Sequence, residues 1–261
     1  MAFKIAAWNV NSILARLPTA LALFKEIDAD VWCLQEIKCE DHRFPRLEIE
    51  DLGYNVETFG QKSYNGVALL SKHRMEDVTR GVPGLEHEHS RYIEALISAP
   101  SGPIRVASLY APNGNPVQTE KFTFKLHFMD ALRDHLKALL AHEEPVDIAG
   151  DYNVIPRDED ADDPPSWLGD ALMTPDARGK YRALQHIGYA DAFMQIDGRG
   201  RQFTFWDYQA GAWRRDHGIR IDHHLLSPQA ADRLTGVHIH RDARAMEKAS
   251  DHVPIIATLD L

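Results

Sequence analysis

The chain has 261 residues, of which 44% are hydrophobic and 26% are charged, and these ordinary proportions exclude a disordered or fibrous protein. No apolar run approaches the roughly 18 residues that cross a bilayer, and the first residues lack a signal-peptide pattern, so we expect a cytoplasmic protein with no membrane contact. The formal net charge of −10 argues at first against a polyanionic partner, because nucleic-acid binding draws much of its affinity from Lys and Arg.

Short apolar runs alternate with helical patterns along the chain. Apolar residues at helical spacing predict two clear helices, at residues 17–27 and 121–140. The runs that predict strands are 5–8, 31–34, 54–56, 67–70, 93–97, 104–109, 146–149, 219–226 and 254–259. Gly and Pro mark turns between these runs, and no linker or repeat divides the chain. We therefore expect one α/β layered domain over residues 1–261.

The charge is unevenly distributed along the chain. Acidic residues gather at 48–51 and 158–163, whereas Lys and Arg accumulate between residues 178 and 220. A protein that is acidic overall can be basic on one face. The net charge therefore does not exclude a nucleic-acid partner, and acidic residues also suit a site that holds a cation.

The two cysteines are predicted to be reduced and structural. Cys33 lies in the apolar run at 31–34, and a disulfide framework would need more cysteines than Cys33 and Cys39. With His42 they still lack a fourth zinc ligand at workable spacing. We do not expect a zinc site there.

Polar residues follow or interrupt several of the predicted strands. They are Asn9, Asn11, Glu36, Asp151, Asn153, Asp222, Asp251 and His252. Strand ends are where α/β folds place their ligands. Carboxylates and amides that converge at one edge would repel each other and lose hydration unless a cation or a matching donor lies among them. The pattern therefore predicts a cation site.

The kind of ligand indicates which ion and which chemistry. Oxygen ligands from Asp, Glu and Asn suit Mg²⁺ or Mn²⁺, whereas a zinc site would show closely spaced His and Cys. A hard ion beside one His suits phosphate-ester hydrolysis, because the metal offsets charge on the phosphoryl oxygens while a carboxylate activates water. We expect Mg²⁺ as the cofactor, with Mn²⁺ as the alternative.

Seven motifs in a fixed order extend this interpretation. They are Ala-Trp-Asn-Val-Asn-Ser at 7–12, Leu-Gln-Glu-Ile-Lys at 34–38, Tyr-Asn-Gly-Val-Ala-Leu-Leu-Ser at 64–71, Leu-Tyr-Ala-Pro-Asn-Gly at 109–114, Gly-Asp-Tyr-Asn at 150–153, Arg-Ile-Asp at 220–222 and Ser-Asp-His-Val-Pro at 250–254. Together they resemble the exonuclease III family of apurinic/apyrimidinic (AP) endonucleases, within the endonuclease/exonuclease/phosphatase superfamily. The resemblance spans nearly the whole chain. The stretches 66–72, 203–208 and 218–222 are what resemble the DNA-repair branch in particular.

The resemblance implies a fold and an activity. The fold would be a four-layered α/β sandwich, in which two mostly antiparallel β-sheets pack face to face with helices outside. The activity would be that of a Mg²⁺-dependent DNA-repair nuclease acting in base excision repair. It would combine a 3′–5′ exonuclease on double-stranded DNA, an AP endonuclease that cleaves 5′ to abasic sites, and a 3′-end phosphodiesterase and phosphatase. Its partner would be double-stranded DNA with abasic sites or 3′ ends, and the protein would be a monomer.

The resemblance also implies a metal set. Glu36 would be the principal metal ligand, with Asn9, Asp151, Asn153 and Asp251 near the ion directly or through water. Asp151 would handle the proton of the attacking water or of the leaving group. Asn153 would hold the water and the phosphate.

The other catalytic roles concern the phosphate. Tyr110 and His252 would contact phosphate oxygens. Asp222 would orient His252 and favour its charged form, because an anion beside an imidazole raises the pKa of the imidazole. Hydrolysis would proceed by in-line attack on phosphorus without a covalent enzyme intermediate.

A further set of residues is predicted to contact DNA. Phe205, Trp206 and Ile219 would form an apolar slot for a baseless sugar turned out of the duplex, and the nearby arginines would meet phosphates. The complete predicted set is Asn11, Asn113, Phe205, Trp206, Arg214, Arg215, Ile219 and Arg220.

Each of these residues also has a simpler structural interpretation. An Asn after a strand is commonly a turn residue, an acid there can cap a helix, and a lone Tyr or His is commonly part of the core. The joint occurrence in family motifs favours the functional interpretation. By contrast, we interpret residues 158–163 as a solvated acidic loop and residues 86–89 as a surface loop, because neither has the spacing of a metal site.

Two alternatives remain open at this stage. One is a superfamily phosphodiesterase or phosphatase that acts on a small phosphate ester, and the other is a nucleic-acid-binding protein without turnover. Ile37 departs from the family pattern after Glu36, and His223 and His224 depart from it after Asp222. These departures leave the hydrogen bonding around the site, and the balance among activities, open.

Overall fold

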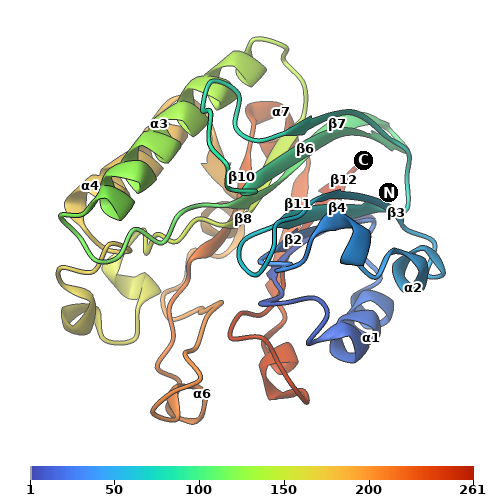
Figure 1. Cartoon of the computed structure of the whole chain (residues 1–261). Helices are drawn as coiled ribbons and strands as arrows, with labels where there is room; N and C mark the ends of the chain where they lie inside the picture. The colour runs from blue at the N-terminus through green and yellow to red at the C-terminus, as the bar shows by residue number, and fades with distance from the viewer. Residues whose placement is uncertain (1) are drawn as a thin grey trace.

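Two six-stranded sheets form the centre of the computed structural model, which describes residues 2–261 (Figure 1). The first sheet has the order β11-β12-β1-β2-β4-β3, with β1 (Ala2–Asn9), β2 (Val31–Gln35), β3 (Asn55–Phe59), β4 (Val67–Ser71), β11 (Leu234–Ile239) and β12 (Ile255–Asp260). The second has the order β5-β6-β7-β8-β10-β9, with β5 (Met75–Arg80), β6 (Tyr92–Ala99), β7 (Gly102–Tyr110), β8 (Val146–Asp151), β9 (Ala190–Asp191) and β10 (Asp222–Leu226). Only β1 with β2 and β7 with β8 pair in parallel among these described strands.

Helices cover the outer faces of both sheets. In Figure 1, α1 (Leu17–Ile27) and α2 (Arg46–Glu50) lie against the first sheet, while α3 (Glu120–Leu140) and α4 (Pro175–His186) lie against the second. The shorter helical segments are α5 (Ala192–Ile196), α6 (Ala212–Arg215), α7 (Pro228–Ala231), η1 (Asp41–Arg43), η2 (Asp158–Asp160), η3 (Pro164–Trp167) and η4 (Arg241–Ala245). The predicted four-layered sandwich is therefore confirmed.

Three apolar layers hold the sandwich together. Between the sheets, residues such as Ile5, Leu69 and Val106 are fully buried. A second layer joins the first sheet to α1, and a third joins the second sheet to α3 and α4. Because both faces of the central strands are covered, β2 and β4 are buried at every position, and their sequences read as continuous apolar runs.

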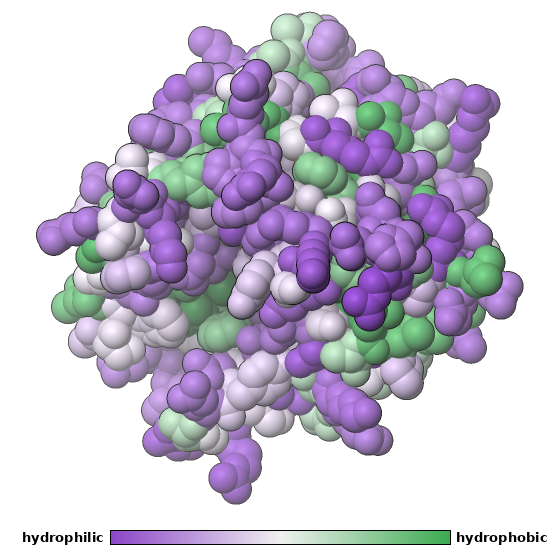
Figure 2. Space-filling model, in the orientation of Figure 1, coloured by the Kyte–Doolittle hydropathy of each residue, from purple (hydrophilic) through white to green (hydrophobic). Residues whose placement is uncertain are grey.

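The face of the molecule shown in Figure 2 is mostly hydrophilic, with hydrophobic residues scattered among polar ones. Isolated exposed apolar side chains such as Leu47 and Leu168 are ordinary for a protein surface. No helix within residues 2–261 is both long enough and apolar enough to cross a membrane.

The predicted elements agree with the structure where periodicity was strong. The helix at 17–27 has the predicted bounds, and the helix at 121–140 begins one residue earlier, at Glu120. The predicted strand at 219–226 is wrong at its start, since β10 begins at Asp222 and Ile219 instead makes isolated bridges to Phe205 and Ala161. The prediction missed the edge strands β5 and β11, which are only partly buried, and the two-residue edge strand β9.

The predictions for the cysteines and for residues 86–89 agree with the structure, whereas the prediction for residues 158–163 needs a correction. Cys33 and Cys39 are free thiols, as predicted, and residues 86–89 lie in a largely exposed loop. The acidic segment 158–163 is not simply solvated. Asp160 is fully buried within it, because its carboxylate is paired with Arg157 and Arg220.

Candidate active site

Strand register brings distant motif residues into one row. Asp151 at the end of β8 pairs with Tyr110 on β7 and with Asp222 on β10. In the first sheet, Asn9 at the end of β1 pairs with Gln35, directly before Glu36. The ends of the two sheets meet here, so side chains from both sheets face one another.

The backbone changes direction at these strand ends through residues with a positive φ angle. Asn11 (φ 46), Glu36 (φ 50) and Asn153 (φ 49) adopt the left-handed conformation, which is uncommon for residues other than glycine. Such residues concentrate at functional sites, where the surrounding structure holds them. Gly150 is required before Asp151, because a Cβ at this position would lie 2.0 Å from the carbonyl oxygen of Leu109.

Asn9 connects the two carboxylates that come from different sheets. Its Nδ2 donates to Glu36 Oε1 at 2.9 Å and to Asp151 Oδ2 at 3.0 Å. The Nζ of Lys38 lies 2.7 Å from Glu36 Oε2. Burial opposes ionisation, but the hydrogen bonds from Asn9 and Lys38 lower the pKa of Glu36 below its usual value. Glu36 is therefore an ionised carboxylate at neutral pH.

A second group links Asp222, His252 and Asp151. His252 Nδ1 lies 2.9 Å from Asp222 Oδ2, and His252 Nε2 lies 3.8 Å from Asp151 Oδ2. Burial alone would lower the pKa of His252, but the charges of Asp222 and Asp151 and the hydrogen bond to Asp222 raise this pKa to about 10. Burial raises the pKa of Asp151, helped by the Asp222 charge and opposed by His252. The imidazole therefore remains a cation at neutral pH.

The ligand atoms of Asp151, Asp222 and His252 lie within 4.8 Å of one another, a spacing that could hold a metal ion. His252 Nδ1 and Asp222 Oδ2 already contact each other at 2.9 Å, however. His252 and Asp222 are therefore better suited to holding a proton and a positive charge near the substrate than to binding a metal ion. Glu36 and Asp151 are the better candidates for a hard cation.

Asn153 is held by three hydrogen bonds. Its Nδ2 donates to the carbonyl oxygen of Ala111 at 2.9 Å, and its Oδ1 accepts from Asn113 Nδ2 at 3.2 Å. Its backbone N–H donates to Asp151 Oδ1 at 2.8 Å. The amide orientation at this position is therefore fixed before any substrate binds.

Asn11 and Asp251 lie at the rim next to Glu36. Asn11 Nδ2 donates to Asp251 Oδ1 at 3.0 Å, and Lys38 Nζ donates to Asn11 Oδ1 at 2.6 Å. Lys38 therefore connects the Glu36 carboxylate with the side-chain amide of Asn11. Asn11 is also within 3.4 Å of the hydroxyl of Tyr208, which is half exposed.

These groups surround a cleft of about 260 Å³. It is lined by Glu36, Tyr110, Asn113, Asn115, Asp151, Asn153, Trp167, Asp170, Leu172, Phe205, Asp207, Ile221, Asp251 and His252. Five of these lining residues carry carboxylates, whereas His252 is the one basic side chain among them. This oxygen-rich donor set fits a hard divalent ion.

Tyr110 is suited to donate a hydrogen bond into this cleft. Burial and the charges of Glu36 and Asp151 raise the pKa of Tyr110 well above its usual value. The guanidinium of Arg91 lies 4.7 Å from the centre of its ring. Tyr110 therefore keeps its phenolic proton at any physiological pH.

Three of the predicted DNA contacts, Trp206, Ile219 and Arg220, are wrong because their side chains are buried. Trp206 is fully buried, its ring packs on Trp213, and its Nε1 donates to Asp216 Oδ1 at 3.0 Å. Ile219 is also buried and does not line the cleft. Phe205 does line the cleft, because residues 203–206 direct their aromatic side chains to different sides of the segment.

Arg220 cannot contact a DNA phosphate. Its side chain is fully buried, with Nε 3.0 Å from Asp160 Oδ1 and Nη1 2.9 Å from Asp191 Oδ2. A buried guanidinium needs such paired carboxylates. Arg214 and Arg215 are exposed on α6, in a loop that Figure 1 shows projecting away from the sheets.

The sequence analysis missed several residues of the site. The apolar wall of the cleft is formed by Trp167, Leu172 and Ile221 beside Phe205, and nothing in the local sequence around residue 167 distinguishes it from an ordinary surface turn. Lys38 lies within a quoted motif but was given no role.

Lys125 was also missed. It is fully buried on α3, and its Nζ donates to the carbonyl oxygens of Asn113, Asn153 and Ala171 at 3.0, 2.6 and 2.9 Å. It therefore joins three loops around the cleft. Its position among buried residues of the helix was a usable signal.

Comparisons with known proteins match this geometry. Residues 6–252 match the model of the Endonuclease/Exonuclease/phosphatase family. Exodeoxyribonuclease III of Haemophilus influenzae is 35% identical over 263 residues, which cover 97% of this chain and 98% of that protein. The 3′ phosphatase NExo from Neisseria, solved with a product DNA hairpin, superposes with a TM-score of 0.95 at 33% identity over 100% of both chains. An AP endonuclease from Archaeoglobus fulgidus gives a TM-score of 0.94 at 33% identity, covering 99% of this chain and 100% of that one.

Proposed function

The chain belongs to the endonuclease/exonuclease/phosphatase family, and we propose that it is a nuclease of the exodeoxyribonuclease III type that hydrolyses phosphate esters of double-stranded DNA with Mg²⁺. The observation that carries this proposal is the meeting of Glu36, Asp151, Asn153 and His252 in one cleft. Relatives named exodeoxyribonuclease III and AP endonuclease support the substrate class. The proposed activities are 3′–5′ exonuclease, AP endonuclease, and 3′-end phosphodiesterase and phosphatase.

Glu36 and Asp151 would hold the Mg²⁺, with Asn9, Asn153 and Asp251 near it. When bound, the ion supplies positive charge that offsets the charge developing on the phosphoryl oxygens. Asp151 accepts the proton of the attacking water, a role that suits a buried carboxylate with a raised pKa. Asn153, whose amide is held in place, positions that water.

Tyr110 and His252 act on the other side of the phosphate. The Tyr110 hydroxyl and the His252 imidazolium each donate a hydrogen bond to a phosphoryl oxygen, where negative charge increases in the transition state. Asp222 keeps the imidazole oriented and protonated through its 2.9 Å contact. Water attacks phosphorus directly, and the ester P–O bond breaks without a covalent enzyme intermediate. The proton that Asp151 takes from the water is then available for the leaving oxygen.

The apolar wall of the cleft suggests how a damaged nucleotide is accepted. Phe205, Trp167 and Leu172 offer a surface on which a sugar without a base can lie once it is turned out of the duplex. Asn11 and Asn113 at the rim, and Arg214 and Arg215 on α6, would contact the flanking backbone. The abasic site as preferred substrate rests on this wall.

The central test uses abasic duplex DNA and the Asp151→Asn variant. We expect the wild type to nick this DNA with Mg²⁺ and to stop when EDTA is added. Asp151→Asn should fold with a similar Tm and lose turnover, since its amide cannot accept a proton. Asp134→Asn, at a surface position on α3 with a 69% exposed side chain, is the matched control and should cleave normally.

The same assay separates the alternatives. Phosphatase activity on a small ester together with inertness towards DNA would indicate the small-substrate enzyme, and DNA binding without cleavage would indicate a non-catalytic protein. Parental cleavage by Asp151→Asn would contradict the assignment of Asp151. A single domain over residues 1–261, the monomeric state, Mn²⁺ as an alternative ion and the cytoplasmic location stay predictions.

A further inference from the structure

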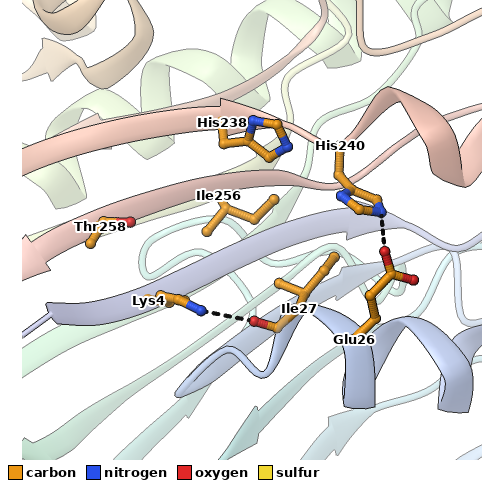
Figure 3. Close-up of a pocket in the computed structure, with 7 residues that line it drawn as sticks. All are labelled: Lys4, Glu26, Ile27, His238, His240, Ile256 and Thr258. Carbon is orange, nitrogen blue, oxygen red and sulfur yellow. Dashed lines mark hydrogen bonds and ion pairs between the residues drawn. The ribbon is translucent and has the colours of Figure 1, made fainter.

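A second cavity lies on the outer face of the first sheet, with a volume of about 280 Å³. Figure 3 shows its walls, which are formed by the end of α1, by β11 and by the neighbouring strands. Its lining residues are Lys4, Glu26, Ile27, His238, His240, Ile256 and Thr258. None of them lines the catalytic cleft, and the proposed hydrolysis uses none of them.

Two histidines lie at the end of the edge strand β11, with His238 inside the strand and His240 directly after it. Both side chains line the cavity, as Figure 3 shows. Their ring centres are 5.9 Å apart. Glu26 approaches from α1, and its Oε1 lies 3.3 Å from His240 Nε2.

This spacing matches that of two ligands on one metal ion. Zinc binds imidazole nitrogen and carboxylate oxygen at roughly 2.0–2.2 Å, so two ligands at a tetrahedral angle are about 3.3 Å apart. The ligand atoms of Glu26, His238 and His240 do not all lie within 4.8 Å of one another in this structure. His238 therefore has to rotate about its side-chain bonds to complete the set, which its exposure allows. The remaining positions are open to water.

The surroundings favour an ion over an organic ligand. Ile27 and Ile256 line the cavity together with Lys4 and Thr258, so few polar groups besides the proposed ligands are present to orient a larger molecule. The Lys4 ammonium donates to the carbonyl oxygen of Ile27 at 3.1 Å, so it does not occupy the Glu26 carboxylate. Imidazole nitrogen suits Zn²⁺, Cu²⁺ or Ni²⁺, whereas carboxylate oxygen suits Mg²⁺.

We propose that Glu26, His238 and His240 form a second metal site, which takes a divalent transition-metal ion such as Zn²⁺. The ion joins the edge strand β11 to the end of α1, two elements from opposite ends of the chain. Binding to the folded state alone stabilises that state, so the site acts as a clamp on the outer layer and leaves the hydrolytic chemistry unchanged.

Cu²⁺ is the spectroscopic probe for this site, because the nitrogen hyperfine splitting in its electron paramagnetic resonance spectrum reports bound imidazoles. Saturating Mg²⁺ is present to occupy the catalytic cleft. We expect one equivalent of Cu²⁺ to show two coupled nitrogens in the wild type and in His142→Ala, an exposed control position. The double variant with His238→Ala and His240→Ala should lose this signal.

Zn²⁺ titration gives an independent measurement. Removing groups that only support a ligand costs about tenfold or more in metal affinity, so loss of His240 itself should weaken Zn²⁺ binding at least that much. Zn²⁺ should raise the Tm of the wild type and of His142→Ala more than that of the double variant. Glu26→Gln should keep two coupled nitrogens and bind Zn²⁺ more weakly.

The proposal is overturned if the double variant keeps the two-nitrogen spectrum and its Zn²⁺ affinity, or if the wild type takes up neither ion under saturating Mg²⁺. Without added Zn²⁺ or Cu²⁺ all variants should keep the wild-type Tm, which shows that they fold. Neither the Cu²⁺ spectrum nor the Zn²⁺ titration measures DNA cleavage, so the two proposals can fail separately.

Discussion

Replacing Lys125 by methionine should destabilise the protein and disturb the cleft. The side chain is fully buried, and its ammonium donates to three backbone carbonyls. Methionine has a similar length and no donor. The variant therefore leaves the carbonyl oxygens of Asn113, Asn153 and Ala171 without their partner while it fills the same space.

Two opposing terms set the size of the effect. Burial lowers the pKa of Lys125 from 10.5 to about 7, which corresponds to a cost of about 5 kcal/mol for holding the ammonium there below pH 7. Hydrogen bonds to a charged group contribute about 1.5–3 kcal/mol each, and three of them offset that cost. The net loss on substitution is about 2 kcal/mol, or a fall in Tm of about 4–8 °C for a chain of this size.

The loss of stability in the Lys125→Met variant depends on pH, because Lys125 titrates differently in the folded and unfolded states. The folded-state pKa of Lys125 lies below the unfolded value, so the cost of burial is fully present below pH 7 and fades as the pH rises towards 10.5. Thermal unfolding should therefore be followed below pH 7, with Lys137→Met, an exposed position on the same helix, as control. A Lys125→Met variant as stable as the wild type, or more stable, would refute the reasoning. A fall in kcat without a matching fall in folded fraction would show that Asn113 and Asn153 have moved.

Three further predictions concern charge and packing. Asp222→Asn should lower the pKa of His252 from about 10, so the alkaline limb of the kcat/KM profile should move to lower pH; an unmoved limb would count against the imidazolium. Exchanging Arg214 and Arg215 for alanine should weaken DNA binding and reduce the slope of log K against log salt by about 2, whereas the parental slope would exclude both contacts. Gly150→Ala should cost about 3 kcal/mol or more, because its Cβ would lie 2.0 Å from a carbonyl oxygen; a parental Tm would contradict this.

The sequence predicted the parts of the site that lie in local motifs. Glu36, Asp151 and His252 each stand beside a predicted strand, and the order of the motifs indicated that they meet. The pairing of Asp151 with Tyr110 and Asp222 depends on the order of strands in the sheet. A single sequence without that topology does not contain it.

The errors share a physical cause. Arg220 lies in a family motif and was expected at the surface, but its partners Asp160 and Asp191 come from segments far along the chain. Lys125 was overlooked for the related reason that a lysine is normally exposed. The partners of a buried guanidinium or ammonium become known only with the fold, although the helical spacing of Lys125 from Phe128 and Leu132 indicated the buried side of α3.

Asn9 and Glu36 belong to one sheet and Asp151 to the other, so the hydrolytic groups straddle the seam between two β-layers. Catalytic activity therefore depends on how the two sheets are positioned relative to each other. If one sheet moved along the other, Glu36 would separate from Asp151 before either sheet lost its own hydrogen bonds. An enzyme built this way should lose activity in the same cooperative step in which the layers part, with no active fragment surviving on one layer alone.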